Sequence, residues 1–229
     1  MSGRIAILAQ ARLGSSRLPC KSLLALRGLP VIDWVWQRLQ KCASVASIIV
    51  AIPDTPLDAV LAEHLSRGGV QFMAGPEQDV LRRMAQAARL VNADYVVRVC
   101  ADNPFVWSGA IDSLVDFYRR SQCDYAWNHV PRDNMWPDGL GAEMTSAELL
   151  FELDRVAALP AQREHCFNYI WDNREQFRMA TFDPPEVWLR RPEIRLDIDT
   201  ETDFQRLSLL PVSVASDAAA IIAAWDGAA

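Results

Sequence analysis

Apolar runs of strand length alternate with segments of helical periodicity through the first half of this sequence, and no other feature restricts its fold as much. The runs occupy residues 5–9, 47–52, 70–73 and 94–100. Between the first two runs, apolar residues repeat with the spacing of one helix face, at Val31, Ile32, Val35 and Leu39. Strands that alternate with helices form a mostly parallel sheet covered by helices on both faces. The sequence therefore predicts an α/β fold.

Helix starts can also be placed from the sequence. Thr55 and Pro56 predict one between the second and third runs, because threonine caps helices well and proline suits the first turn. The apolar face of that helix is expected to hold Leu57, Val60, Leu61 and Leu65. Two more apolar faces of helical spacing follow, within residues 80–91 and 111–118.

The second half of the chain is less regular. We expect strands at residues 124–128, 177–182 and 194–200, and helices at residues 146–157, 162–175, 200–208 and 215–225. Residues 128–142 show no period, and irregular segments of that length are usually binding loops or lids. Because there is no linker or low-complexity tract, we expect one domain over residues 1–229 with a small inserted lobe at 124–175.

Composition narrows the possible partners and compartment. The chain has 229 residues, of which 51% are hydrophobic, enough to form a packed core. A formal net charge of −6 disfavours a nucleic-acid partner, because the phosphate backbone would be repelled. No segment reaches the ~18 apolar residues of a membrane span, so no membrane association is expected. The five cysteines lack C-x-x-C spacing, which indicates reduced thiols and a cytoplasmic protein.

The segment ARLGSSRLPCK, residues 11–21, follows the first predicted strand and combines small residues with positive charge. In an open parallel sheet, ligands bind beyond the carboxyl ends of the strands. Gly14, Ser15 and Ser16 allow backbone N–H groups to approach an anion, and the cations that can neutralise a polyphosphate are Arg12, Arg17 and Lys21. A solvated basic loop is the alternative. The position after a strand favours phosphate binding, although neither G-x-x-x-x-G-K-[ST] nor G-x-G-x-x-G is present.

Six segments, in order along nearly the whole chain, resemble one family: residues 9–39, 79–88, 93–105, 137–144, 163–173 and 196–204. Their sequences are similar to those of the cytidylyltransferases that activate acidic keto-sugars, a group that contains CMP-Kdo synthetase and acylneuraminate cytidylyltransferase. The resemblance is strongest to the spore coat polysaccharide biosynthesis protein F branch. The family usually has glycine where this chain has Cys20.

The resemblance implies a Rossmann-like nucleotide-diphospho-sugar transferase sheet and an Mg²⁺-dependent enzyme. Such an enzyme transfers CMP from CTP to an acidic keto-sugar, releases pyrophosphate, and serves surface polysaccharide biosynthesis. The resemblance also implies a homodimer that exchanges a lobe, for which residues 124–175 are the natural candidate. Catalysis would rest on positioning and electrostatics, with Arg12, Lys21 and Asp102 as the catalytic residues.

Carboxylates at the ends of two predicted strands indicate a metal site. Asp102 follows the fourth strand, and Asp197 and Asp199 are expected to face one way because alternate strand residues do. Carboxylate oxygens with substrate phosphates are the ligands that Mg²⁺ prefers. The alternatives are a turn-forming role for Asp102 before a proline, and a helix N-cap role for Asp199.

Further residues are expected to contact the base and the acceptor. By resemblance, cytosine should lie over Ala9, Gln10 and Ala11, with Arg82 and Arg98 as further nucleotide contacts. Arg83 is expected on an exposed helix face, whereas Arg98, in the middle of a strand, requires a buried partner. The residues in the segments that match the acceptor side of the family are Asn128, Asp138, Gly139, Glu143 and His165. Three tryptophans can wall the acceptor pocket or belong to the core: Trp127, Trp136 and Trp171.

Three other functions remain open on the sequence alone. A metal-dependent glycosyltransferase would use residues 197–199, DID, as a D-x-D motif. A nucleotidyltransferase that acts on a sugar 1-phosphate or a phosphonate fits the same nucleotide site. A nucleotide-binding protein without turnover is the third, because Cys20 departs from the family pattern.

Overall fold

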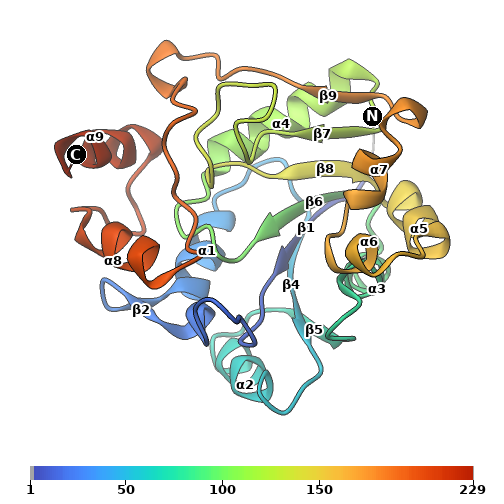
Figure 1. Cartoon of the computed structure of the whole chain (residues 1–229), viewed down its shortest axis with the longest axis horizontal. Coiled ribbons are helices and arrows are strands. Elements are labelled where there is room, and N and C mark those ends of the chain that lie inside the picture. Colours follow the sequence, from blue (N-terminus) through green and yellow to red (C-terminus); the bar gives the residue numbers. More distant parts are fainter. Residues whose placement is uncertain (1–2, 229) are drawn as a thin grey trace.

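A seven-stranded sheet crosses the computed structural model, which describes residues 3–228 (Figure 1). The strands are β1 (Ile5–Gln10), β4 (Ser47–Pro53), β5 (Phe72–Gly75), β6 (Tyr95–Cys100), β7 (Tyr125–Trp127), β8 (Glu143–Ser146) and β9 (Met179–Thr181). Their order is β5-β4-β1-β6-β8-β7-β9. The four strands β5, β4, β1 and β6 are parallel, and β8 runs antiparallel to both β6 and β7. The predicted α/β fold with a mostly parallel sheet is confirmed.

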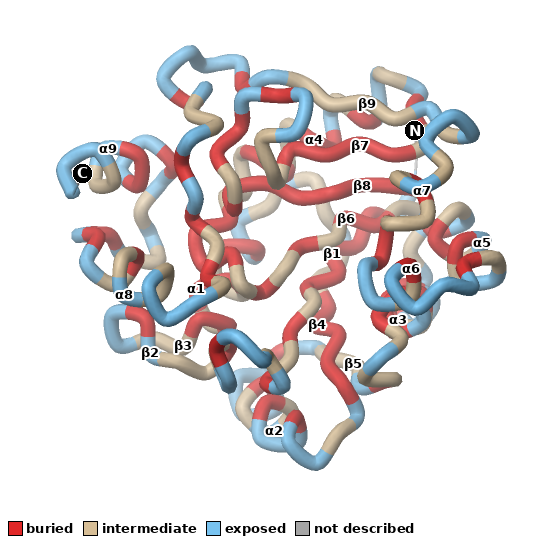
Figure 2. Tube along the Cα trace, viewed as in Figure 1, coloured by how far each residue is buried: buried red, intermediate tan, exposed pale blue. Residues whose placement is uncertain are grey.

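Alternate side chains of β1 enter two separate cores, one on each face of the sheet. Ile5, Ile7 and Ala9 pack in the core beneath α1 (Val31–Leu39), α2 (Ala59–Arg67) and α4 (Ser108–Ser121). Ala6 and Leu8 pack in the opposite core. That core is covered by α3 (Val80–Leu90), α5 (Ala147–Val156) and the segment that includes α6 (Pro160–Glu164) and α7 (Asn168–Asp172). Figure 2 shows the central strands buried and the loops and outer helix faces exposed.

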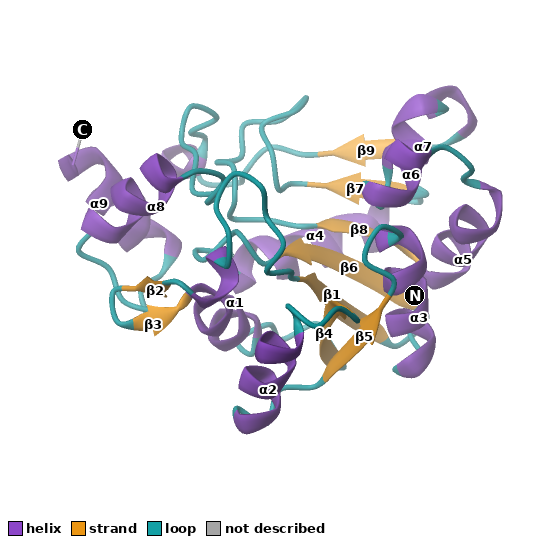
Figure 3. Cartoon of the chain, turned by 60° about the horizontal axis from the view of Figure 1, so that its bottom comes forward, coloured by secondary structure: helices purple, strands orange, loops and turns teal. Residues whose placement is uncertain are grey.

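A third apolar cluster lies at one end of the molecule, around the buried indole of Trp136. It joins the hairpin of β2 (Ala25–Leu26) and β3 (Leu29–Pro30) to α8 (Glu201–Leu209) and α9 (Ala218–Ala228). In Figures 1 and 3, α8 and α9 lie together at this end, and α5, α6 and α7 lie at the other. Three 3₁₀ segments complete the structure: η1 (Lys21–Leu23), η2 (Arg174–Gln176) and η3 (Val187–Leu189).

The strand expected at residues 194–200 does not form. Its backbone bonds to two different loops. Asp138 donates its N–H to Ile194 O at 2.9 Å and accepts the N–H of Leu196 at 3.0 Å, and the N–H of Ile198 donates to Asp102 O at 2.9 Å. Only an isolated bridge joins Asp138 and Arg195. The apolar alternation that predicts a strand here instead buries Leu196 and Ile198 in the third cluster.

The helix expected to begin at Thr55 begins at Ala59 instead. The Thr55 hydroxyl donates to the Asp58 carboxylate at 2.6 Å, and Asp58 accepts the N–H of Leu13 at 2.8 Å. The turn at 55–58 therefore anchors the loop after β1 and does not extend the helix. Two residues expected on the apolar face are exposed: Leu57, in this turn, at 49%, and Val60, in α2, at 55%.

The segment 124–175 differs in detail from its prediction. The helix expected at 162–175 is divided into α6, α7 and the start of η2, and β8 was not predicted at all. Strand β8 has only four residues and opens on the charged Glu143, which hides its strand character. Residues 124–175 thus contribute β7 and β8 to the central sheet and α5, α6 and α7 to one face of it. Their role in a dimer stays a prediction.

None of the helices that the structure describes between residues 3 and 228 combines the length and the apolar character needed to cross a membrane.

Candidate active site

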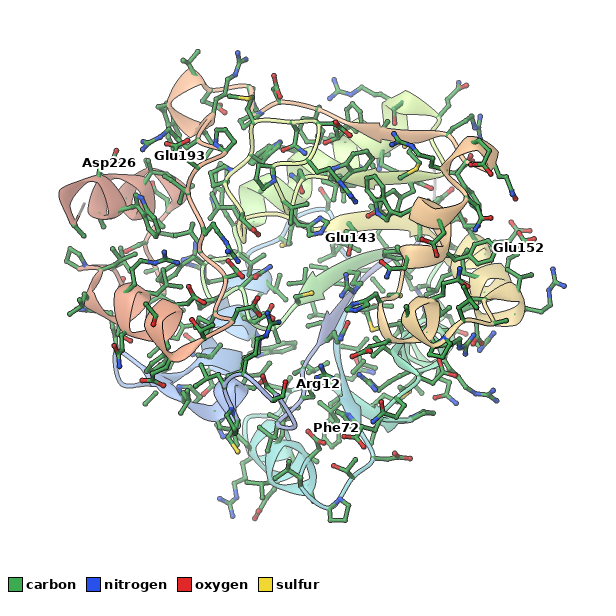
Figure 4. All side chains as sticks on the ribbon, viewed as in Figure 1. Arg12, Phe72, Glu143, Glu152, Glu193 and Asp226 are labelled. Atoms are coloured by element: carbon green, nitrogen blue, oxygen red, sulfur yellow. The ribbon has the colours of Figure 1, made fainter. Side chains whose placement is uncertain are left out.

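A polar cleft opens beyond the carboxyl ends of β1 and β6, where the parallel sheet was expected to bind a ligand. Its volume is about 200 Å³. The lining comes from the loop after β1, the ends of β1 and β6, and two single residues: Gln10, Ala11, Arg12, Ser15, Ser16, Arg17, Lys21, Ser22, Arg98, Cys100, Ala101, Asp102, His165 and Asp199. We call this space the central cleft. Figure 4 labels Arg12 on one side of the site and Glu143, on β8, on the other.

The loop after β1 is held by its own backbone. The carbonyl of Leu13 accepts N–H groups from Ser15 and Cys20, both at 2.9 Å, and the Ser22 hydroxyl donates to the Arg12 carbonyl at 3.2 Å. Cys20 has a φ of 58°, in the left-handed region that glycine adopts without cost. This conformation gives a physical reason for the glycine that the family usually has at this position.

Lys21 brings the basic loop and the acidic residues together. Its ammonium nitrogen lies 2.8 Å from Oδ2 of Asp102 and 3.7 Å from Oδ1 of Asp199. It also donates to the carbonyl of Ile198 at 2.8 Å. Arg17 lies 3.0 Å from the same Asp199 oxygen, and Arg12 lies 3.8 Å from Glu164. Residues that the sequence placed in three distant segments therefore share one cleft.

The donor chemistry of this cleft fits a hard divalent cation. Asp102 and Asp199 both lie within 4 Å of the Lys21 ammonium, so their carboxylates converge on one position. Across residues 3–228, no group of three or more histidine, cysteine, aspartate or glutamate side chains is arranged around a common metal position. One or two carboxylates completed by substrate phosphates and water are the usual set for Mg²⁺. The two aspartates would hold such an ion together with a bound polyphosphate.

Asp197 does not line the central cleft. Its Oδ2 accepts a hydrogen bond from Arg195 at 2.9 Å, and its buried Oδ1 has no hydrogen-bond partner within residues 3–228. Asp138 lies 3.9 Å from the same Arg195. It lines neither the central cleft nor the second cavity, which adjoins that cleft. Because residues 194–200 are not a strand, the alternation argument that grouped Asp197 with Asp199 does not apply.

Asp199 is not a helix cap either. Thr200 caps α8 and accepts the N–H of Asp203, which in turn accepts the N–H of Thr200. The carboxylate of Asp199 is therefore left to face Lys21 and Arg17.

A second cavity adjoins the central cleft, and we call it the side pocket. Its lining is drawn from β6, β8, the loop after β7 and the start of α7: Arg98, His129, Val130, Arg132, Glu143, His165, Cys166, Phe167, Asn168 and Trp171. Arg98 and His165 line both cavities. The guanidinium of Arg132 lies over the Trp171 ring, 4.0 Å from its centroid. The pocket thus presents cationic and imidazole groups on an aromatic wall.

Arg98 has the buried partner that its position in a strand requires. It forms an ion pair with Glu143, and the side chains of the two residues are 13% and 6% exposed. The hydroxyl of Tyr125 donates to the other oxygen of Glu143. Burial opposes ionisation of Glu143, but the charges of His129 and Arg98 and the hydrogen bond from Tyr125 outweigh it, so its pKa lies below the ordinary value. Glu143 is therefore a buried anion that fixes Arg98.

Several predicted site residues line neither cavity. Ala9 is buried in β1, Gly14 and Arg82 are exposed, and Asn128 is buried with its amide bonded to the backbone of Ala110 and Ala142. Gly139 has a φ of +91°, and a Cβ there would lie 3.0 Å from the backbone carbon of Leu196. Gly139 and Asn128 thus have structural roles in this region.

The expectation that Arg83 lies on an exposed helix face is wrong. Its side chain is fully buried and donates to the carbonyls of Pro76 and Glu77. Burial lowers the pKa of Arg83 to about 10. A charged residue on a helix is predicted to be exposed to solvent, because the sequence does not show which backbone carbonyls accept hydrogen bonds from its side chain.

Sequence reasoning missed His129, Arg132 and Cys100 as residues of the site. His129 and Arg132 lie in the aperiodic segment 128–142, which was expected to bind a ligand. They are the histidine and the arginine of that segment, so a search for charge within it would have found them. Of the three tryptophans, Trp171 lines the side pocket, whereas Trp127 and Trp136 are buried in cores.

The chain is similar to several known proteins along most of its length. Residues 6–217 match the family model described as Cytidylyltransferase. The spore coat polysaccharide biosynthesis protein SpsF of Bacillus subtilis is 29% identical over 211 residues, which are 90% of this chain and 85% of SpsF. A 3-deoxy-manno-octulosonate cytidylyltransferase of Hydrogenovibrio crunogenus is 32% identical over 122 residues, 52% of this chain and 48% of that protein. The structure of a cytidylyltransferase from Leptospira borgpetersenii superposes with a TM-score of 0.88 at 27% identity, covering 99% of this chain and 95% of that one.

Proposed function

This chain belongs to the cytidylyltransferase family, and from that membership we propose that it transfers CMP from CTP to an acidic keto-sugar with release of pyrophosphate. The proposed setting is surface polysaccharide biosynthesis, which the name of the Bacillus subtilis relative supports. The single observation that carries the proposal is the meeting of Lys21, Asp102 and Asp199 in one cleft.

The reaction asks for positioning and for neutralisation of charge. The anomeric hydroxyl oxygen of the acceptor forms a bond to the α-phosphorus, the bond from that phosphorus to the bridging oxygen breaks so that pyrophosphate leaves, and the hydroxyl proton is released to solvent. Arg12, Arg17 and Lys21 line the cleft and can offset the charge of the triphosphate as it redistributes. Asp102 and Asp199 would hold Mg²⁺, which when bound supplies further charge neutralisation at the phosphate oxygens.

The side pocket supports an acceptor that carries a carboxylate. It shares Arg98 and His165 with the central cleft, so an acceptor in the pocket adjoins the phosphates in the cleft. Arg98 is already paired with Glu143, whereas Arg132, which lies over the Trp171 ring, has no carboxylate partner among residues 3–228 and can meet an acidic group. The Trp171 ring offers an apolar face for the sugar carbons.

The test is pyrophosphate release with purified protein, Mg²⁺ and each nucleoside triphosphate, against keto-deoxy sugar acids and sugar 1-phosphates. We expect turnover with CTP and a keto-deoxy acid, and loss of it in Arg132→Ala through a raised KM for the acceptor. Arg155→Ala, an exposed arginine of α5, is the matched control. Turnover only with a sugar 1-phosphate would show that the acceptor is this sugar phosphate and not an acidic keto-sugar. Consumption of a nucleotide sugar without pyrophosphate release would indicate a glycosyltransferase.

A further inference from the structure

The side chain of Gln10 is tied to a buried chain of charged and polar groups. Arg98 donates from Nε and Nη2 to Oε1 of Gln10, at 3.3 and 3.0 Å. The same arginine forms the ion pair with Glu143, which accepts the hydroxyl of Tyr125. Four strands are linked in this way, because the residues lie on β1, β6, β8 and β7. The rotamer of Gln10 is thus set by residues that lie beneath the site.

This contact decides which end of the Gln10 amide faces the cleft. A guanidinium has donors and no acceptor, so only the amide oxygen can face Arg98. The NH₂ group must then point away from Arg98. Within residues 3–228, no hydrogen bond from Nε2 of Gln10 to another group is formed, and Gln10 lines the central cleft. The cleft therefore contains a neutral donor with two N–H bonds held in a fixed direction.

The position of Gln10 relates this donor to the reacting phosphate. Its backbone carbonyl accepts the N–H of Ala101 at 2.9 Å, so it lies beside the segment that carries Asp102. Gln10 lines the central cleft and not the side pocket, whereas Arg98 lines both. The donor therefore lies in the central cleft, bonded to Arg98, the residue that this cleft shares with the side pocket.

We infer that Gln10 is a further catalytic residue, which donates from Nε2 to a non-bridging oxygen of the phosphorus under transfer, and that Arg98 is the positioning residue that holds it there. The inference rests on the proposed function and deepens it. A donor fixed before the reaction stabilises charge that develops on such an oxygen, without reorganisation when it develops. The sequence-based expectation, a contact between Gln10 and the edge of cytosine, is the competing assignment.

The first experiment uses Gln10→Glu. Glutamate retains one oxygen for Arg98 and replaces the NH₂ group by a second oxygen, so the fold and the contact survive while the donor is lost. We expect kcat to fall by about 100-fold or more, with the preference for CTP over UTP unchanged. Gln71→Glu, on the exposed residue before β5, is the matched control and should behave as the wild type.

A binding arm separates this inference from the proposed function because it needs no acceptor. Affinities of both proteins for Mg·CTP, CMP and cytidine are measured by calorimetry or by competition. We expect Gln10→Glu to weaken CTP and CMP by about tenfold or more through repulsion, and to leave cytidine unchanged. Weaker cytidine binding, or a changed CTP preference, would show that Gln10 reads the base and overturn the inference. A wild type that binds CTP without turnover with any acceptor refutes the proposed function alone.

The role of Arg98 is tested by coupling. Arg98→Lys retains a charge for Glu143 but cannot hold the amide through two donors. Each of Arg98→Lys and Gln10→Ala should lower kcat, and the double variant should be no worse than Gln10→Ala, so that its loss is about fivefold or more smaller than the product of the two single losses. Additive losses would indicate that Arg98 acts on the fold independently of Gln10, and would overturn its assignment as a positioning residue.

Discussion

The ammonium nitrogen of Lys21 lies 2.8 Å from Oδ2 of Asp102, although the two residues are 81 positions apart in the sequence. Lys21 begins η1, after the loop that follows β1, and Asp102 follows β6. The pair is partly shielded from solvent: the Lys21 side chain is 12% exposed and that of Asp102 is 26% exposed. Lys21 is already paired with two carboxylates when an anion enters this cleft. The binding of the anion should therefore depend on a cation that pairs with these carboxylates in place of Lys21.

Replacing Lys21 by alanine should weaken triphosphate binding. The variant loses a charge-assisted contact to phosphate, and it leaves Asp102 and Asp199 to repel the ligand. We expect the Kd for CTP, measured by calorimetry with Mg²⁺ present, to rise by about 10- to 100-fold.

Lys41 provides the matched control, because it is the other lysine of the chain and is exposed. Lys41→Ala should bind CTP with the wild-type affinity. If Lys21→Ala binds as tightly as Lys41→Ala, the phosphates lie elsewhere.

Asp102→Asn and Asp199→Asn should each lower turnover by about 100-fold or more, since removal of a carboxylate weakens the hold on a divalent cation. Both variants should need more Mg²⁺ for half-maximal pyrophosphate release. Asp116→Asn, in an exposed pair on α4, should change neither quantity. Turnover that stays near the wild type in both variants, at any Mg²⁺ concentration, would remove the two aspartates from the metal site.

The central cleft could be predicted from the sequence because the carboxyl ends of adjacent parallel strands lie at the same edge of the sheet. Lys21 and Asp102 each follow a strand that the apolar runs predict, and neighbouring parallel strands bring those segments to one edge of the sheet. The side pocket was predicted only in part: Glu143 and His165 were expected at the acceptor side and line it, whereas Arg132 was missed. Arg132 lies in a segment without a period, and its position depends on a tertiary contact with Trp171 that no local pattern encodes.

The incorrect predictions for Arg83 and Asp197 have the same physical cause as the missed position of Arg132. Arg83 was expected to be exposed, because a charge on a helix is normally solvated, yet the carbonyls of Pro76 and Glu77 receive it. Asp197 was paired with Asp199 by strand alternation, but the backbone around it bonds to separate loops. In both places long-range contacts override a local periodicity that is otherwise informative.

The thiols should react very unevenly. Cys20 is exposed, while burial raises the pKa of Cys42, Cys100 and Cys166 to about 12. At pH 8 such thiols are about 0.01% ionised, so a thiol reagent should label Cys20 first. Bound Mg·CTP should slow that labelling, because Lys21 and Ser22, the next residues, line the cleft.

Peptide mapping after brief treatment with N-ethylmaleimide measures both effects. Cys20→Ser should remove the rapidly labelled peptide and leave a protein that reacts slowly. Rapid labelling of the buried Cys166 would mean that the core around it opens more readily than its burial indicates.

The ion pair between Asp124 and Arg178 should make stability depend on pH. Oδ1 of Asp124 accepts a hydrogen bond from Nη2 of Arg178 at 2.7 Å, and Oδ2 accepts the backbone N–H of Arg178 at 2.8 Å. These contacts join the residues that precede β7 and β9. The hydrogen bond from Arg178 lowers the pKa of Asp124 below its ordinary value. A carboxyl with a lowered pKa stabilises the folded state above the pKa of the unfolded chain, about 3.9, and this contribution is lost as the pH falls through the folded value.

Asp124→Asn should therefore lower the free energy of unfolding by about 1 kcal/mol at pH 7, discounted for the exposure of the pair, and by progressively less below about pH 4. Urea unfolding of both proteins at pH 7, 5 and 3 measures the difference. Asp116→Asn again serves as the control, because its pair with Arg119 is longer, at 3.5 Å, and the Asp116 side chain is 63% exposed against 30% for Asp124. A deficit in Asp124→Asn that remains constant from pH 7 to pH 3 would show that the asparagine disturbs packing between β7 and β9, and that the charge of Asp124 contributes nothing.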